Sequence, residues 1–260
     1  MDGDARVAPR LMLVTDRTLG PLGMLPALVE RAVDGGVDAV QLREKDLPER
    51  ELVALGRKLR EVTRGRALLL VNGTVEQAMA CDADGVHVGE GVYLTPPAPL
   101  PSQGRGEFSS TVGGSISFVR EMSIPNQPSQ ERTPPSLRGK GAGGLGLLRS
   151  RAAHGVEAAR RAEAEGADWI VLGTIYRSRS HPGGATGGLD LVTQVSETVR
   201  VPVIAIGGIT SENAGAAISA GASGIAVISA ILGAEDPRAA AAAMAEAINA
   251  ALPRSVGEQA

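Results

Sequence analysis

Cysteine and aromatic residues are scarce in this chain of 260 residues. Phe, Trp and Tyr make up only 2% of the sequence, which argues against the base-stacking platforms of nucleic-acid-binding proteins. A formal net charge of -3 leaves no electrostatic reason to expect nucleic acid or an anionic membrane as partner. Cys81 is the single cysteine, so no disulfide can form within the chain, and a reducing compartment fits this composition.

Long hydrophobic runs are also absent. The longest apolar stretches, near Val201–Ile209 and Gly224–Leu232, are much shorter than the roughly 18 residues that cross a bilayer. Residues Met1–Arg10 are polar and charged and lack the apolar segment of a signal peptide. We therefore expect a cytoplasmic protein without membrane or nucleic-acid partners. The sequence leaves open whether identical subunits assemble.

One local pattern recurs four times: a helical stretch ends in Gly or Ala, often with Asp, and leads directly into a short run rich in Val and Ile. The copies cover residues 36–42, 83–89, 166–173 and 221–228. Short apolar runs that do not alternate with polar residues are typical of strands covered on both faces, as in a parallel sheet. Further runs of this kind stand at Leu11–Val14, Ala67–Val71 and Val203–Ile206.

Helical patterns separate these strands, with a capping box at Thr74–Gln77. Repeated β-α units in this number favour an α/β fold of the (β/α)8 or TIM-barrel type over residues 11–252, between polar tails at 1–10 and 253–260. A doubly wound open sheet is the alternative. It would need a dinucleotide fingerprint after the first strand, and Val14-Thr15-Asp16-Arg17 is not one.

Residues 96–148 interrupt this pattern. The segment is rich in Pro, Gly and Ser and poor in sustained apolar periodicity, so we expect a disordered surface insertion that neither folds nor contributes to catalysis. It stands where the fourth helix and the fifth strand should be. Residues 144–148 are the expected remnant of that strand, and the insertion blurs the register of the residues that follow.

The active site of such a barrel lies at the carboxyl ends of its strands. Arg43 and Lys45 follow the second strand two residues apart, so in extended backbone they would point the same way and could neutralise a diphosphate. The alternative is ordinary surface charge, offset by Glu44 and Asp46. The histidines show no metal-ligand spacing, and we expect His87 to be a packed, hydrogen-bonded residue at a strand end.

The ends of the last two strands, Gly207-Gly208 and Ile228-Ser229, stand where barrels often bind a phosphate through backbone N–H groups. Tight turns without a ligand would need the same glycines. The loop Tyr176–Gly184 carries hydroxyls, guanidiniums and glycines that suit a phosphate lid, and the alternative is a solvated loop.

Seven segments in this order resemble the thiamine phosphate synthase family and its close relatives, the thiazole tautomerases: Val14–Asp16, Val40–Lys45, Leu70–Asn72, Ala83–Gly89, Leu172–Tyr176, Pro202–Ile209 and Gly224–Ile231. The resemblance implies a transferase of thiamine biosynthesis. Such an enzyme joins hydroxymethylpyrimidine diphosphate to a thiazole phosphate, giving thiamine phosphate and diphosphate.

The resemblance also implies residue roles. Gln41, Arg43, Lys45 and Asn72 would hold the pyrimidine diphosphate, with Arg43 and Lys45 as the catalytic cations. The thiazole phosphate would be held by residues of three loops: Ser178, Ser180, His181, Gly208, Ile228 and Ser229. Of these, the two serines replace family threonines and His181 replaces a lysine.

The family's magnesium site is the main departure. Its ligand aspartates are replaced by Gly73 and Val92, and Glu90 is the nearest candidate carboxylate. Gly73 resembles some tautomerases, but the histidine that those enzymes use corresponds to Thr174 here. Because Gln41, Arg43 and Lys45 are retained, a synthase ranks before a tautomerase acting on thiazole carboxylate phosphate, and before a non-catalytic relative that binds phosphorylated ligands.

Overall fold

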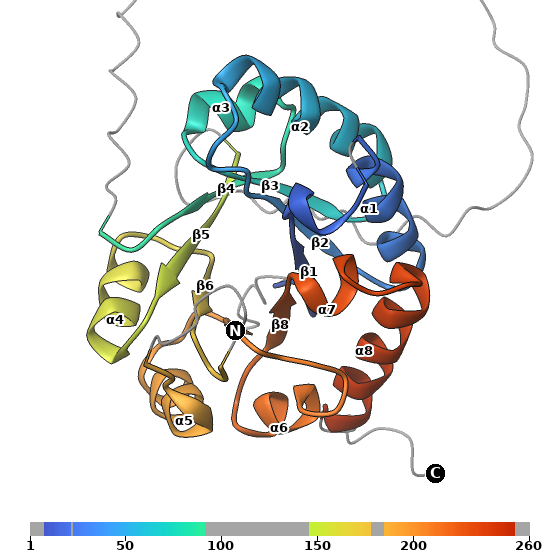
Figure 1. The fold of residues 1–260 in the computed structure, drawn as a ribbon. Helices are drawn as coiled ribbons and strands as arrows, with labels where there is room; N and C mark the ends of the chain where they lie inside the picture. Colours follow the sequence, from blue (N-terminus) through green and yellow to red (C-terminus); the bar gives the residue numbers. More distant parts are fainter. Residues whose placement is uncertain (1–7, 22, 92–145, 178–184, 253–260) are drawn as a thin grey trace, which may run out of the picture. The chain divides into compact units, whose positions relative to one another are not determined.

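Eight parallel strands form a closed barrel in chain order (Figure 1). The computed structural model describes residues 8–21, 23–91, 146–177 and 185–252. The strands are β1 Leu11–Val14, β2 Ala39–Leu42, β3 Leu68–Asn72, β4 Gly85–Val88, β5 Leu148–Ala153, β6 Trp169–Leu172, β7 Val203–Ile206 and β8 Gly224–Val227. The expected (β/α)8 barrel is therefore confirmed.

Helices surround the barrel (Figure 1). They are the short 3-10 helix η1 Arg17–Leu19, α1 Leu25–Asp34, α2 Glu49–Thr63, α3 Val75–Ala80, α4 Val156–Ala164, α5 Gly188–Thr198, α6 Ala214–Ser219, α7 Ser229–Leu232 and α8 Pro237–Ala251. The expected capping box at Thr74 and Gln77 starts α3. None of the helices in the described ranges combines the length and apolar character needed to cross a membrane.

Alternate residues of the strands pack into two separate hydrophobic regions. Met12 and Val14 belong to a small cluster that fills the barrel, whereas Leu11 and Leu13 belong to the larger core beneath the helices. Because neighbouring strand residues point to opposite faces, Gln41 shares the inner face with Ala39. The side chains nearest the carboxyl ends of this inner face form the floor of the mouth.

The aspartates of the recurring pattern are structural residues at the opposite end of the barrel. The carboxylate of Asp38 accepts the backbone N–H groups of Arg10 and Leu11 at 2.8 and 3.0 Å. Asp84 and Asp168 each accept a backbone N–H of the neighbouring strand at 2.8 Å. Burial raises the pKa of Asp38, and the backbone hydrogen bonds partly counteract this increase. Each such Asp therefore links the start of its own strand to the strand before it.

Strand β5 lies further along the chain than we expected. It begins at Leu148, so the prediction of this strand at residues 144–148 is wrong except for its last residue. The sequence Leu148-Arg149-Ser150-Arg151 hides the strand, because arginines occupy the outward positions where apolar residues usually stand. Arg151 is accommodated there by an ion pair with Glu165. Residues 96–145 of the expected insertion lie outside the described residues.

Candidate active site

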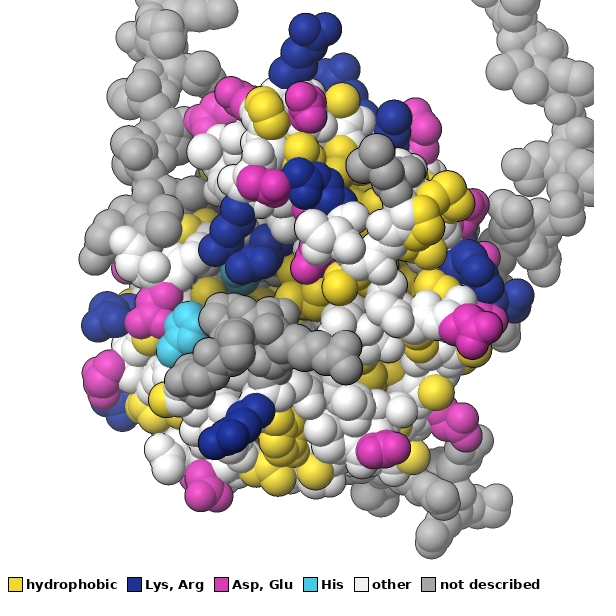
Figure 2. Space-filling view, viewed as in Figure 1, with side chains coloured by type: hydrophobic (Ala, Val, Ile, Leu, Met, Phe, Trp, Pro, Cys, Tyr) yellow, Lys and Arg dark blue, Asp and Glu magenta, His cyan; other side chains and the backbone are white. Residues whose placement is uncertain are grey.

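The mouth at the carboxyl ends of the strands is a recess in the face shown in Figure 2. Hydrophobic side chains are visible within the recess, and Lys and Arg side chains gather at one edge. An apolar recess with charged groups at its edge is the usual form of a site for a small charged ligand.

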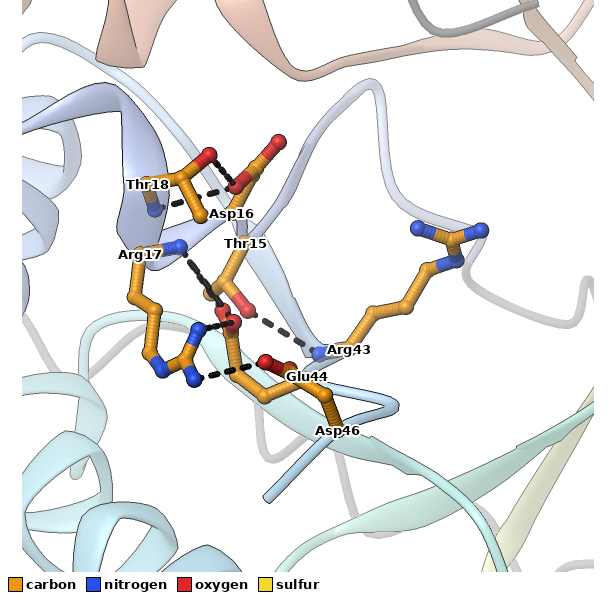
Figure 3. A network of polar contacts seen from close by, with 7 residues as sticks. All are labelled: Thr15, Asp16, Arg17, Thr18, Arg43, Glu44 and Asp46. Atoms are coloured by element: carbon orange, nitrogen blue, oxygen red, sulfur yellow. Dashed lines mark hydrogen bonds and ion pairs between the residues drawn. The ribbon is translucent and has the colours of Figure 1, made fainter.

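Gln41 and Arg43 bring two different polar groups to this recess from the end of β2. Gln41 is buried, and its Oε1 atom has no hydrogen-bond partner within the described residues. Such an acceptor is costly to bury, so it is suited to a donor on a ligand. The backbone N–H of Arg43 donates to the Thr15 hydroxyl at 2.9 Å, and its guanidinium points away from Glu44 and Asp46 (Figure 3).

The alternative interpretation, in which Glu44 and Asp46 offset the charges of Arg43 and Lys45, does not match the structure. Asp46 pairs with the Arg17 guanidinium at 2.7 Å, and Glu44 accepts the backbone N–H of Arg17 at 3.1 and 3.3 Å. Lys45 is exposed. In the described part of the chain, neither Arg43 nor Lys45 has an ion-pair partner. Both positive charges are thus available to an anionic ligand.

Asn72, His87 and Ser150 lie side by side across β3, β4 and β5. The Nδ1 atom of His87 lies 2.8 Å from the Oγ of Ser150, which bears out the expectation of a packed, hydrogen-bonded histidine. Burial, with a further contribution from the charges of Arg43 and Arg151, lowers the pKa of His87 to about 4. The imidazole is therefore neutral near pH 7. Sequence reasoning left the role of Ser150 open, because the insertion blurred the register of β5.

The described residues do not fit the magnesium site that the resemblance implies. Gly73 has no side chain, and a Cβ atom placed there would collide with the Gln77 side chain of the capping box. The Glu90 carboxylate lies 2.6 Å from His154 Nδ1 and 3.8 Å from the Arg161 guanidinium, so it already faces two basic groups. No group of three His, Cys, Asp or Glu residues suited to a metal occurs among the described residues. Val92 lies outside the described residues.

The corner expected to hold a phosphate is built around two glycines with positive φ angles. Gly207 and Gly208 have φ values of 109° and 64°, which other residues rarely adopt. A side chain on Gly208 would also collide with the carbonyl oxygen of Arg177. The Tyr176 N–H donates to the Gly207 carbonyl at 2.9 Å. The segment after β6 is thus held against the end of β7.

The second part of this corner is the end of β8. Ile228 is half-buried, and Ser229 is exposed at the first position of α7. The first N–H groups of a helix have no partners within it, so they are available to a ligand. Ser178, Ser180 and His181 lie outside the described residues, and their expected roles stay predictions.

Comparison with known proteins gives consistent matches. A family model described as thiamine monophosphate synthase matches residues 11–99 and 149–231. The thiamine-phosphate synthase of Moorella thermoacetica is 35% identical over 226 residues, which are 86% of this chain and 88% of that protein. The thiamine-phosphate synthase of Pyrococcus furiosus is 33% identical over 230 residues, covering 88% of this chain and 89% of that protein.

Solved structures agree with these matches. The thiamine phosphate pyrophosphorylase from Pyrococcus furiosus superimposes with a TM-score of 0.67 at 30% identity, over 94% of this chain and 97% of that one. A 3-hexulose-6-phosphate synthase superimposes with a TM-score of 0.57 at 19% identity, which shows a common fold alone. The family model and the two synthases together cover most of the barrel, and on these grounds the chain belongs to the thiamine monophosphate synthase family.

Proposed function

We propose that this protein is a thiamine phosphate synthase and that it couples hydroxymethylpyrimidine diphosphate with a thiazole phosphate. The bond between the pyrimidine methylene carbon and the diphosphate oxygen breaks, and the diphosphate leaves with the electron pair. The thiazole nitrogen then uses its lone pair to form the new carbon–nitrogen bond. Both steps depend on charge neutralisation and positioning more than on a general base.

The observation that carries this proposal is the pair of cations after β2. Arg43 and Lys45 lie at the carboxyl end of a barrel strand without an ion-pair partner in the described ranges, beside the buried acceptor of Gln41. Cations placed where negative charge develops on a leaving group lower the barrier to its departure. The nearby His87 is neutral at pH 7 and does not need a counter-ion of its own.

The other substrate is assigned to the corner formed by the ends of β7 and β8. Gly208 and the first N–H groups of α7, together with Ser229, would bind the thiazole phosphate. The segment after β6 is held against this corner, which supports the expected contribution of Ser178 and Ser180. Because the described residues do not fit a magnesium site, no step of this proposal depends on a metal bound to the protein.

A direct assay tests the proposal. Purified protein with both phosphorylated substrates and saturating magnesium should form thiamine phosphate and diphosphate. No product above background would reject the synthase. Isomerisation of thiazole carboxylate phosphate in the same preparation would select the tautomerase, which Gly73 favours and Thr174 disfavours. Binding of both substrates without turnover of any of them would select the non-catalytic relative. A cytoplasmic location stays a prediction.

A further inference from the structure

Glu44 stands between Arg43 and Lys45 in sequence, but its side chain points toward Arg17. Its side chain is only 3% exposed, and both carboxylate oxygens accept the backbone N–H of Arg17, at 3.1 and 3.3 Å. Figure 3 shows Glu44 beside Arg17, with the Arg43 side chain extending away from both. Glu44 is therefore an internal contact between the ends of β1 and β2, not a surface charge.

This contact is energetically demanding. Burial raises the pKa of Glu44, while hydrogen bonds from the Thr15 side chain and the Arg17 backbone counteract the effect. The Arg17 guanidinium is 4.0 Å from Glu44 and is directed to Asp46, at 2.7 Å. The neutral backbone N–H of Arg17 thus holds this carboxylate more closely than any cation of the described residues does. An apolar residue at this position would leave the Arg17 N–H without its acceptor, so the carboxylate is needed for the geometry it holds.

Thr15 extends this contact to the ligand-facing residues. Its backbone N–H donates to the Gln41 carbonyl at 2.9 Å, and its hydroxyl accepts the Arg43 N–H at 2.9 Å. Its side chain also lowers the pKa of the neighbouring Glu44 carboxyl. These two hydrogen bonds fix the backbone on either side of Leu42 against Thr15, at the end of β1. Lys45 follows Glu44 directly, at the start of the turn, so the same anchor limits its position.

We propose that Glu44 is a positioning residue for the diphosphate subsite: through its hydrogen bonds with the Arg17 backbone it holds the segment from which Arg43 and Lys45 meet the diphosphate. Its role in turnover rests on the proposed function, whereas its role in anion binding does not. A positioning role and simple electrostatics predict opposite changes in anion affinity when the Glu44 side chain is removed. Removing a negative charge near an anion site should strengthen anion binding, unless the charge holds the site together.

Three variants separate these two effects: Glu44→Ala, Glu44→Gln and Asp46→Asn. Titration calorimetry with inorganic diphosphate should show about tenfold weaker binding to Glu44→Ala, the loss expected when a charge-assisted contact to the ligand is misplaced. Glu44→Gln loses the charge but keeps an oxygen for the Arg17 N–H, so it should bind diphosphate as well as the parent protein or more tightly. Asp46→Asn is the matched control for loss of an acid and should bind equally well or more tightly.

Activity gives a second, independent measurement. Glu44→Ala should raise the KM for the pyrimidine diphosphate while leaving the KM for the thiazole phosphate unchanged, which global unfolding could not do. Tighter or unaltered diphosphate binding by Glu44→Ala would overturn the inference. So would a parent protein that does not bind diphosphate. A parent protein that binds diphosphate but forms no thiamine phosphate would instead remove the proposed function, and the binding comparison would still decide the role of Glu44.

Discussion

The His87 ring and the Ser150 hydroxyl meet at 2.8 Å inside the barrel, although 63 residues separate them in sequence. The contact joins β4 to β5 across the point where the insertion interrupts the chain. It also fixes one ring nitrogen of a buried histidine. Because burial removes the ring from water and the charges of Arg43 and Arg151 act on it, protonation of this histidine is unfavourable in the folded protein.

His87 should make the protein less stable in mild acid. Its pKa falls from 6.5 to about 4 on folding, so between these values the unfolded chain binds the proton more strongly. The free energy of unfolding should therefore decrease as the pH falls from 6.5 and level off below about 4. The full loss is about 3 kcal/mol, since one pKa unit corresponds to about 1.4 kcal/mol.

Urea denaturation of the parent protein and His87→Gln at several pH values measures this contribution. The difference between the two proteins isolates His87 from Asp38 and Glu44, whose pKa values are raised and which change stability with the opposite sign. A difference that does not vary between pH 4 and 6.5 would mean that the buried ring is protonated without cost.

The two halves of the site should respond separately to mutation. Lys45→Ala should weaken binding of the pyrimidine diphosphate by about ten- to a hundredfold, because it removes a charged donor, and should leave thiazole phosphate binding nearly unchanged. Ser178→Ala combined with Ser229→Ala should have the reverse effect. Binding titrations with each substrate measure both. If each variant weakened the binding of both substrates equally, the assignment of the two substrates to separate halves of the site would be wrong.

Metal affinity should improve when a carboxylate is restored after Asn72. Gly73→Asp alone would place its side chain against Gln77, so the informative protein is Gly73→Asp with Gln77→Ala. In the presence of diphosphate this double variant should hold Mn2+ more tightly than Gln77→Ala, as measured by electron paramagnetic resonance. Stoichiometric Mn2+ binding by the parent protein without diphosphate would instead reveal a ligand set that the described residues do not contain.

The insertion should be dispensable for the barrel. Strand β5 begins at Leu148, so removal of residues 101–144 leaves its pairing with Gly85 intact. Replacing that stretch with a short polar linker should alter the melting temperature little, because the closure cost of a loop changes by only about 0.6 kcal/mol per doubling of length. A fall of many degrees, measured by calorimetry, would show that the stretch packs on the barrel.

Prediction succeeded where local sequence and tertiary environment agree. The bounds of β1 and β7 match the predicted runs, because their residues are apolar on both faces of a covered strand. The capping box of α3 is a purely local contact and was predicted for the same reason. Strand β5 was missed because its arginines are stabilised by contacts that local sequence does not contain, such as the ion pair of Arg151 with Glu165.

The sequence alone determined the order of strands and helices and which polar residues stand at the carboxyl end of the barrel, since these follow from hydrophobic periodicity and chain order. Only the tertiary structure decided how those residues are paired. Glu44 turned out to be a buried contact with Arg17 instead of an offset for Arg43, and Ser150 became the partner of His87. Such pairings depend on the register between neighbouring strands of the closed barrel, which brings together residues that local sequence cannot relate.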